Sequence, residues 1–204
     1  MKSTTYLLIG GGLAAGQAVK GIREEDPEGD IVLVNKEPRL PYHRPALSKR
    51  LLRGEQAEED IYLESEAFYD EQEVTTILGT TVTSLDLDAK EVTLSNGEGI
   101  AFDKALLATG GSPIDLKIPG SDLPEVHTLR TVDDSLALQK AAEKGERAII
   151  IGAGFIGMEL AAILTELGVD VTVVEMMPQL WPRFTDEALA GGCQDDRGER
   201  RESL

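Results

Sequence analysis

The sequence predicts an α/β fold of two βαβ units in tandem, the second of them incomplete, with a small antiparallel β meander. An apolar strand runs into a glycine-rich turn and then a helix at residues 6–16, and the same order recurs at residues 147–157. Between them, residues 74–102 alternate apolar and polar side chains around an Asn96-Gly97 turn, which is typical of antiparallel strands. Because the two glycine-rich stretches repeat one pattern, they predict two related units in one chain.

The composition suits one large or two small domains with packed α/β layers. Of the 204 residues, 41% are hydrophobic but only 4% are aromatic, so aliphatic and small side chains fill the core. The formal net charge of −17, with no basic stripe to offset it, predicts no nucleic-acid partner and no anionic membrane partner. The apolar run near the N-terminus is too short for a signal peptide, and no apolar stretch reaches about 18 residues, so we expect a cytoplasmic protein.

The first glycine-rich turn has the features of a Rossmann-like dinucleotide-binding unit. Gly10 permits the sharp turn after the strand, and Gly12 lets a pyrophosphate approach the backbone. Ala15 takes the third position of the G-x-G-x-x-G/A pattern, where a small side chain allows the helix to pack closely on the strand. Leu13 and Ala14 open that helix, whose N–H groups and dipole attract phosphate.

An acidic residue at the expected distance strengthens this interpretation. Glu37 stands just beyond a second strand at residues 31–34, where a carboxylate accepts hydrogen bonds from ribose hydroxyls. The alternative is a nucleotide-free strand and helix with Glu37 merely solvated. The complete order of strand, turn, helix, strand and acid favours the nucleotide site.

The other elements follow from periodicity and from helix and strand breakers. Pro27 and Gly29 end the first helix, and Gly168 stops the last one, while Thr131 or Asp133 caps the helix between the two units. The expected strands are at residues 6–9, 31–34, 74–78, 81–86, 91–94, 99–102, 105–108, 147–151 and 171–174. The expected helices are at residues 13–22, 46–53, 65–71, 135–144, 155–167 and 185–189.

The second glycine-rich turn completes the full G-x-G-x-x-G pattern between a strand and a helix. The next strand ends at Glu175, the acid that a ribose requires. No cation stands beside Glu175, so a 2′-phosphate would be repelled and NADH is favoured over NADPH. The nucleotide contacts predicted here come from Gly152, Gly154, Phe155, Ile156, Gly157 and Glu175.

Residues 40–49, which read LPYHRPALSK, narrow the interpretation to one family. Together with the two tandem turns, this segment resembles the ferredoxin and rubredoxin reductases, a branch that includes the apoptosis-inducing-factor relatives. The branch belongs to the FAD-dependent pyridine nucleotide-disulphide oxidoreductase superfamily. The resemblance covers about residues 5–190, and it implies a glutathione-reductase-like fold with FAD in the first unit and NAD(P)H in the second.

The resemblance also implies roles for individual residues. Arg44 and Lys49 would contact the flavin side, where a cation stabilises the reduced ring, and Val82 would touch the adenine end. Glu159 matches a position near the nicotinamide, and the alternative of a surface helix carboxylate stays open. The implied FAD contacts are Gly10, Gly12, Leu13, Ala14, Ala15, Glu37, Arg44, Lys49, Val82, Ala108, Thr109, Gly110 and Arg130.

The implied function is electron transfer from NADH through FAD to a small iron–sulfur carrier of the ferredoxin or rubredoxin type. The disulfide-reducing relatives carry redox cysteines that this chain lacks near residues 42–47, and Cys193 is incidental. Hydride transfer needs no protein acid or base, so no catalytic residue and no metal site are predicted. The alternatives are a non-enzymatic flavin- and NAD-binding signalling protein of the apoptosis-inducing-factor type, or a fragment of a nitrite reductase large subunit.

The expected domain organisation is an FAD-binding part at residues 1–116 and the first part of an NAD(P)-binding domain at residues 117–190. A charged, irregular tail follows at residues 191–204, where the apolar periodicity stops. We therefore expect the chain to be incomplete and inactive as it stands; the alternative is a genuine disordered tail.

Overall fold

The computed structural model describes residues 2–177, so the expected helix at 185–189 and the tail at 191–204 lie outside the described residues. The chain divides into two compact units, Met1–Ala46 with Gln56–Ser121, and Leu47–Glu55 with Asp122–Leu204. The sequence placed the boundary near residue 116 and did not separate the short segment after Ala46. The assignment of one nucleotide to each part stays a prediction.

The first unit is built on a six-stranded sheet in the order β3-β2-β1-β6-β5-β4. The strands β3, β2, β1 and β6 are parallel, whereas β4, β5 and the first part of β6 form an antiparallel meander. The carboxyl ends of β1, β2 and β6 therefore share one edge, and it is at such an edge that α/β sheets bind ligands. The bounds are β1 Lys2–Ile9, β2 Ile31–Val34, β3 Val74–Ile77, β4 Val82–Asp86, β5 Glu91–Leu94 and β6 Gly99–Leu107.

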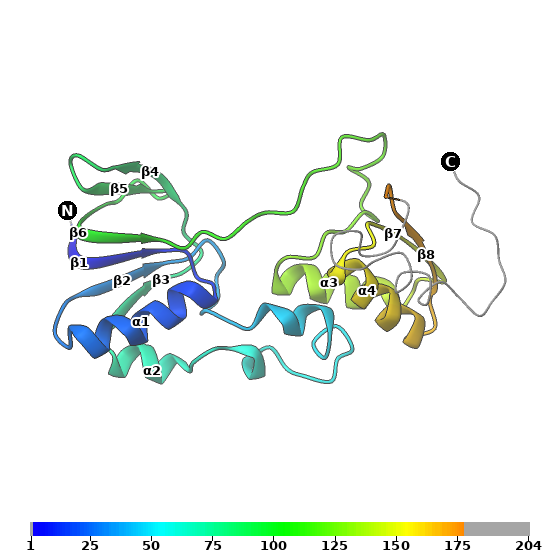
Figure 1. Ribbon diagram of the computed structural model, residues 1–204, viewed down its shortest axis with the longest axis horizontal. Helices are drawn as coiled ribbons and strands as arrows, with labels where there is room; N and C mark the ends of the chain where they lie inside the picture. The colour runs from blue at the N-terminus through cyan, green and yellow to red at the C-terminus, as the bar shows by residue number, and fades with distance from the viewer. Residues whose placement is uncertain (1, 178–204) are drawn as a thin grey trace. The chain divides into compact units, whose positions relative to one another are not determined.

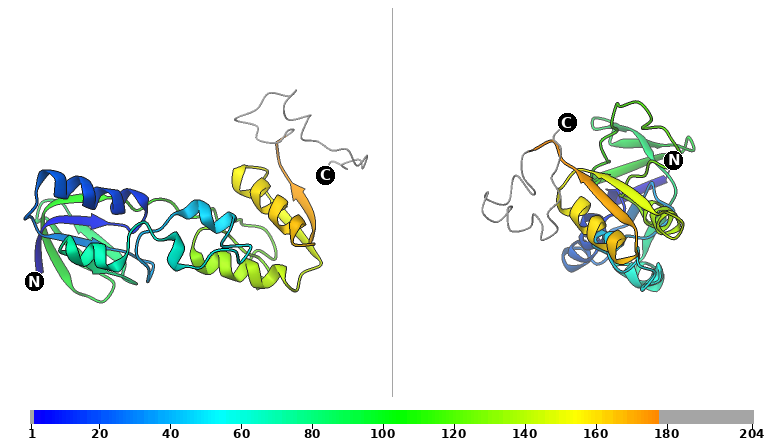
Figure 2. Two further views of the ribbon diagram at one scale, coloured as in Figure 1. Left: turned by 90° about the horizontal axis from the view of Figure 1, so that it is seen from below. Right: turned by 90° about the vertical axis from the view of Figure 1, so that its right-hand side faces the viewer.

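Two helices cover one face of this sheet and the meander folds over the other. Figures 1 and 2 show α1 (Leu13–Glu25) and α2 (Glu66–Glu71) along the same face. Side chains alternate along β1, because Leu8 packs under the helices while Leu7 and Ile9 pack toward the meander. Two short 3₁₀ helices, η1 Arg44–Ser48 and η2 Glu59–Ile61, lie in the loops.

The second unit contains a parallel strand pair with a helix packed on it. The strands β7 (Arg147–Ile151) and β8 (Asp170–Val174) pair along their whole length, and α4 (Phe155–Glu166) connects them and contacts both. This is one βαβ crossover, preceded by α3 (Val132–Ala142). No helix in the described part of the chain is long and apolar enough to cross a membrane.

β1 and α3 begin earlier than expected, at Lys2 and Val132, and two other expected elements have a different form. The strands expected at 99–102 and 105–108 are one strand, β6, because it pairs with β1 along almost its entire length. The helix expected at 46–53 is instead the 3₁₀ helix η1 followed by turns. The N–H of Ala46 donates to the carbonyl of His43, three residues back, so this segment begins with the tighter helical turn.

Candidate cofactor-binding sites

The first glycine-rich turn brings the end of β1 against the end of β6. Gly10 has a φ of +126°, and a Cβ there would lie 2.2 Å from the carbonyl oxygen of Ala108. The N–H of Ala108 donates to the carbonyl of Ile9 at 2.9 Å. Only glycine fits this place, and the turn thereby lies next to Ala108 and Thr109. The FAD contacts that the resemblance implied for these two residues stay a prediction.

The backbone at Gly12 is open, and this openness suits a pyrophosphate. A Cβ there would meet no atom within 4 Å, so packing within the protein does not require a glycine at this position. Gly12 is the N-cap of α1, and no side chain among the described residues caps that helix. In contrast, Ser65 and Thr131 cap α2 and α3 with their own side chains. The first N–H groups of α1, from Leu13 and Ala14 onward, therefore fit a dinucleotide phosphate.

The predicted ribose acid, Glu37, has two short hydrogen bonds within its own loop. Tyr42 donates its hydroxyl to Glu37 Oε2 at 2.6 Å, and Arg44 donates to Glu37 Oε1 at 2.6 Å. Arg44, for which the resemblance implied a flavin-side contact, thus lies against the acid expected at the adenosine ribose. Its contact with a cofactor stays a prediction.

The second glycine-rich turn, like the first, has an open glycine at the N-cap of its helix. A Cβ at Gly157 would lie 2.0 Å from the carbonyl oxygen of Gly152, so this position is glycine because α4 packs closely on the turn. Gly152 and Gly154 would meet no atom within 4 Å, and Gly154 is the N-cap of α4 with no side-chain cap in the described structure. Phe155 and Ile156, which open α4, are about half exposed. This turn also fits a dinucleotide phosphate.

Glu175 is fixed at the end of β8 by backbone donors. Its carboxylate accepts hydrogen bonds from the N–H of Met177 at 2.9 Å and from the N–H of Ala153, in the turn, at 2.7 Å. These bonds hold the pKa of the Glu175 carboxyl below its usual value. The residue is therefore a carboxylate at neutral pH and lies against the glycine-rich turn, where the sequence placed a ribose.

Lys49 and Glu159, predicted separately to lie near the reacting rings, are joined in the second unit. Lys49 Nζ donates to Glu159 Oε2 at 2.7 Å, and Ser48 Oγ donates to the same oxygen at 2.6 Å. Burial raises the pKa of the Glu159 carboxyl, but these two hydrogen bonds outweigh burial and lower the pKa overall. The pair joins a cation to a carboxylate on α4. A nicotinamide-side role for Glu159 stays a prediction, and its alternative, a surface helix carboxylate, stays open.

The remaining predicted residues are distributed over both units. Gly110 has a φ of +67° and follows β6, as expected for the turn after that strand. Val82, in β4, packs against the core cluster on the meander face of the sheet. Arg130 lies just before α3, where its N–H donates to the Asp134 carboxylate at 2.9 Å. A cofactor contact from Val82 or Arg130 stays a prediction.

Three residues that support these sites had no role in the sequence interpretation. They are Tyr42, which bonds Glu37; Ser48, which bonds Glu159; and Asn35, whose carboxamide bonds the loop that carries Glu37. Tyr42 and Ser48 both lie within the segment that suggested the family. That segment could therefore have drawn attention to Tyr42 and Ser48, but its sequence does not indicate which side chain each of these two residues contacts.

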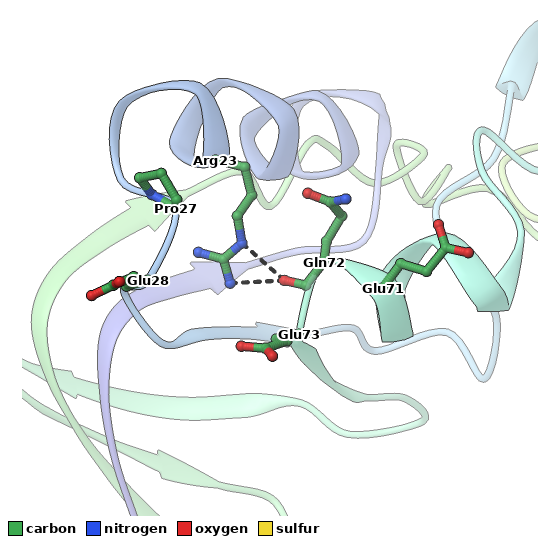
Figure 3. Close-up of a pocket in the computed structure, with 6 residues that line it drawn as sticks. All are labelled: Arg23, Pro27, Glu28, Glu71, Gln72 and Glu73. Carbon is green, nitrogen blue, oxygen red and sulfur yellow. Dashed lines mark hydrogen bonds between the residues drawn. The ribbon is translucent and has the colours of Figure 1, made fainter.

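A cavity of about 450 Å³ lies at the C-terminal end of α1, the end away from Gly12. Figure 3 shows Arg23 in this cavity with its guanidinium bonded to the carbonyl oxygen of Gln72. Arg23 also donates to the carbonyl of Gly29 at 2.7 Å. Arg23 donates its N–H groups to these backbone carbonyls and so links α1 to the end of α2. The residues that line the cavity do not include those of the glycine-rich turns.

Comparison with known proteins identifies the family. Residues 4–200 match the family described as pyridine nucleotide-disulphide oxidoreductase. The chain belongs to this family. The fold predicted from the two turns is confirmed by solved structures of its members, and the family together with its relatives implies FAD and NAD(H) as cofactors.

Individual members of the pyridine nucleotide-disulphide oxidoreductase family are similar to almost all of the chain. It is 37% identical over 190 residues to the biphenyl dioxygenase system ferredoxin–NAD(+) reductase component of Paraburkholderia xenovorans, covering 93% of this chain and 46% of that protein. The ferredoxin reductase for the CYP199A2 system from Rhodopseudomonas palustris superposes with a TM-score of 0.88 at 33% identity, covering 92% of this chain and 46% of that one. The covalent putidaredoxin reductase–putidaredoxin complex gives a TM-score of 0.84 at 30% identity, covering 94% and 46%. The chain thus spans about half the length of the relatives that it matches.

Proposed function

We propose that this protein is an FAD-dependent oxidoreductase that passes electrons from NADH through flavin to a small iron–sulfur carrier of the ferredoxin or rubredoxin type. The observation that carries the proposal is the pair of open glycine-rich turns, at Gly12 and Gly154, in a chain of this family. The first turn would hold FAD and the second NADH. The carrier is supported by the names of the relatives, which include ferredoxin reductase components and a putidaredoxin reductase in complex with putidaredoxin.

The residues of the first unit would bind and orient the flavin nucleotide. Gly12 and the first turn of α1 would accept the pyrophosphate, and Glu37 would accept hydrogen bonds from the adenosine ribose. When bound, FAD takes two electrons as a hydride from NADH and delivers them singly, which matches a two-electron donor to a one-electron carrier. No protein acid or base is needed for that transfer, so the protein supplies positions and electrostatics.

The residues of the second unit would bind NADH. Gly154 and α4 would accept the NADH pyrophosphate, and Glu175 its ribose, with a preference against a 2′-phosphate. The family resemblance implies a flavin-side role for Lys49, since a positive charge near the ring favours the anionic reduced form. We also propose a cytoplasmic location, because NADH is available there.

A test of this function separates cofactor binding from turnover. These residues, extended with the remaining half of a full-length ferredoxin reductase relative, would be purified and titrated with FAD, then with NADH under anaerobic conditions, and the loss of flavin absorbance would be followed. Ferricyanide and a ferredoxin would then serve as acceptors. We expect FAD to bind, NADH to bleach it, and the ferredoxin to be reduced; a flavin-loaded protein that reduces neither acceptor would contradict an electron-transfer role and favour a signalling protein.

Two glycine variants distinguish the sites. Gly12→Ala should lose FAD, whereas Gly154→Ala should keep FAD but bind NADH more weakly, because in each case the new methyl group occupies only the open space at the turn. The same loss of FAD in both variants would contradict the assignment of the two turns.

A further inference from the structure

We propose that Tyr42 is a positioning residue for the adenosine ribose of FAD, acting by holding the Glu37 carboxylate in place. The inference deepens the proposed function and rests on its assignment of Glu37 to that ribose. No role for Tyr42 follows from the glycine-rich turn or from the acid beyond β2. The evidence is the hydrogen bonding of three side chains within the first unit.

Tyr42, Glu37 and Arg44 form a closed ring of hydrogen bonds. The Tyr42 hydroxyl donates to Glu37 Oε2 at 2.6 Å, Arg44 donates to Glu37 Oε1 at 2.6 Å, and Arg44 also donates to the Tyr42 hydroxyl oxygen at 3.0 Å. The guanidinium lies over the Tyr42 ring, 5.0 Å from its centre. The ring of bonds thus fixes both oxygens of the carboxylate and neutralises its charge.

Tyr42 is held so firmly that it can serve as the fixed point of this ring. Its side chain is 1% exposed. Its backbone bridges Tyr62, and the flanking bonds join His43 to the carbonyl of Ile61 at 2.8 Å and Leu63 to the carbonyl of Pro41 at 2.9 Å. Glu37 therefore meets a hydroxyl whose position is set by packing and not by the cofactor.

The ring is connected to the glycine-rich turn through Asn35. The N–H of Glu37 donates to Asn35 Oδ1 at 3.2 Å, and the Asn35 carboxamide lies where a Cβ of Gly11 would otherwise stand. The carboxylate is thereby set at the edge of the turn that would hold the pyrophosphate. A carboxylate has about four lone-pair sites, so Glu37 can accept from Tyr42 and Arg44 and still accept from ribose hydroxyls.

A second cluster of a glutamate, a tyrosine and an arginine in the same unit provides a matched comparison. Tyr62 donates its hydroxyl to Glu58 Oε1 at 2.8 Å, and Arg39 donates to the same oxygen at 2.8 Å. It has the same three residue types, but its acid is not the one that follows β2. Removing either tyrosine hydroxyl deletes one bond to a glutamate, and only Tyr42 should affect FAD.

The test compares Tyr42→Phe with Tyr62→Phe in the full chain. Dissociation constants would be measured for FAD and for an FAD analogue with 2′,3′-dideoxyadenosine, together with the thermal unfolding of each apoprotein. Tyr42→Phe should weaken FAD binding about 10- to 100-fold, as expected for a lost hydrogen bond to a charged group, and leave analogue binding almost unchanged. Tyr62→Phe should change FAD binding by less than about twofold, which is below about 0.4 kcal/mol.

Three outcomes overturn the proposal. They are FAD binding by Tyr42→Phe at the wild-type level, an equal loss for FAD and the analogue, and a wild-type chain that binds no FAD. Should Tyr42→Phe fail to fold, Tyr42→Met removes the same hydroxyl, and it must show the same loss confined to FAD or the proposal fails. A chain extended to the length of its relatives that binds FAD but passes no electrons contradicts the proposed function and leaves this test intact.

Discussion

The carboxamide of Asn35 occupies the place where any side chain of Gly11 would stand. A Cβ added at Gly11 would lie 2.0 Å from Asn35 Cγ and 2.1 Å from Nδ2. Asn35 is buried and cannot swing away, since its amide donates to the carbonyl of Arg39 at 2.7 Å. The middle glycine of the first turn is thus required by the loop that carries Glu37, whereas a Cβ added at Gly12, one residue later, would meet no atom within 4 Å.

Alanine substitutions at the two adjacent glycines should therefore have different effects, one on stability and the other on FAD binding. Gly11→Ala should destabilise the apoprotein by about 1–3 kcal/mol, because the methyl group overpacks a buried amide. Gly12→Ala should leave the apoprotein stability within about 0.5 kcal/mol of wild type, because the added methyl group meets no atom, and should lose FAD. Urea unfolding of the apoproteins and FAD titration check both. Equal stability of the two variants would contradict the packing argument.

The contrast between these glycines also shows which features of the structure could be predicted from the sequence. The order of strand, turn, helix and acid predicted β1, α1, β2 and the place of Glu37, because these depend on local pattern. The bonds from Tyr42 to Glu37 and from Ser48 to Glu159 depend on tertiary contacts; the second joins residues 111 positions apart. A sequence pattern carries no signal for such contacts, so Tyr42 and Ser48 were missed although both stand in the segment that suggested the family.

Glu175 should set the choice between NADH and NADPH. Its carboxylate is fixed against the second turn by the N–H groups of Met177 and Ala153, so a 2′-phosphate would meet a fixed negative charge. Glu175→Ser should raise NADPH affinity relative to NADH by about tenfold, or ~1.4 kcal/mol. Glu146→Ser removes an exposed acid of the same unit and should leave the ratio unchanged. The measurement is the dissociation constant of each nucleotide, and a wild-type preference for NADPH would reject the role of Glu175.

Ser135 should matter for stability because its hydroxyl bond is buried. Ser135 Oγ donates to the carbonyl of Leu47 at 2.7 Å, and the side chain is completely buried. Ser135→Ala removes the donor from a buried carbonyl and should cost about 1–3 kcal/mol. Thr165 donates to the carbonyl of Ala161 at the same 2.7 Å but is exposed, so Thr165→Ala should change stability by less than about 0.5 kcal/mol. Denaturant unfolding would compare the free energies of unfolding of the two variants. Similar losses for both would show that burial does not determine how much each hydroxyl bond stabilises the protein.

The Lys49–Glu159 pair should make the stability of the second unit depend on pH in the acid range. The hydrogen bonds from Lys49 and Ser48 place the folded-state pKa of Glu159 below its ordinary value of 4.5. For a carboxyl with a lowered pKa, the stabilisation is complete above about pH 4.5 and is lost as pH falls through the folded-state pKa. Glu159→Gln should therefore be less stable than wild type near pH 7, and the difference should shrink as the solution is acidified.

The matched control is Glu166→Gln, which removes a carboxylate from the same helix. Glu166 pairs with Arg53 but its side chain is 59% exposed, against 37% for Glu159. Water screens the exposed pair more strongly, so its removal should change the acid dependence less. Urea unfolding of the wild type and both variants, repeated from about pH 7 to about pH 3, gives the comparison. If the stability difference for Glu159→Gln stayed constant across that range, the carboxylate would not be stabilised by its charge.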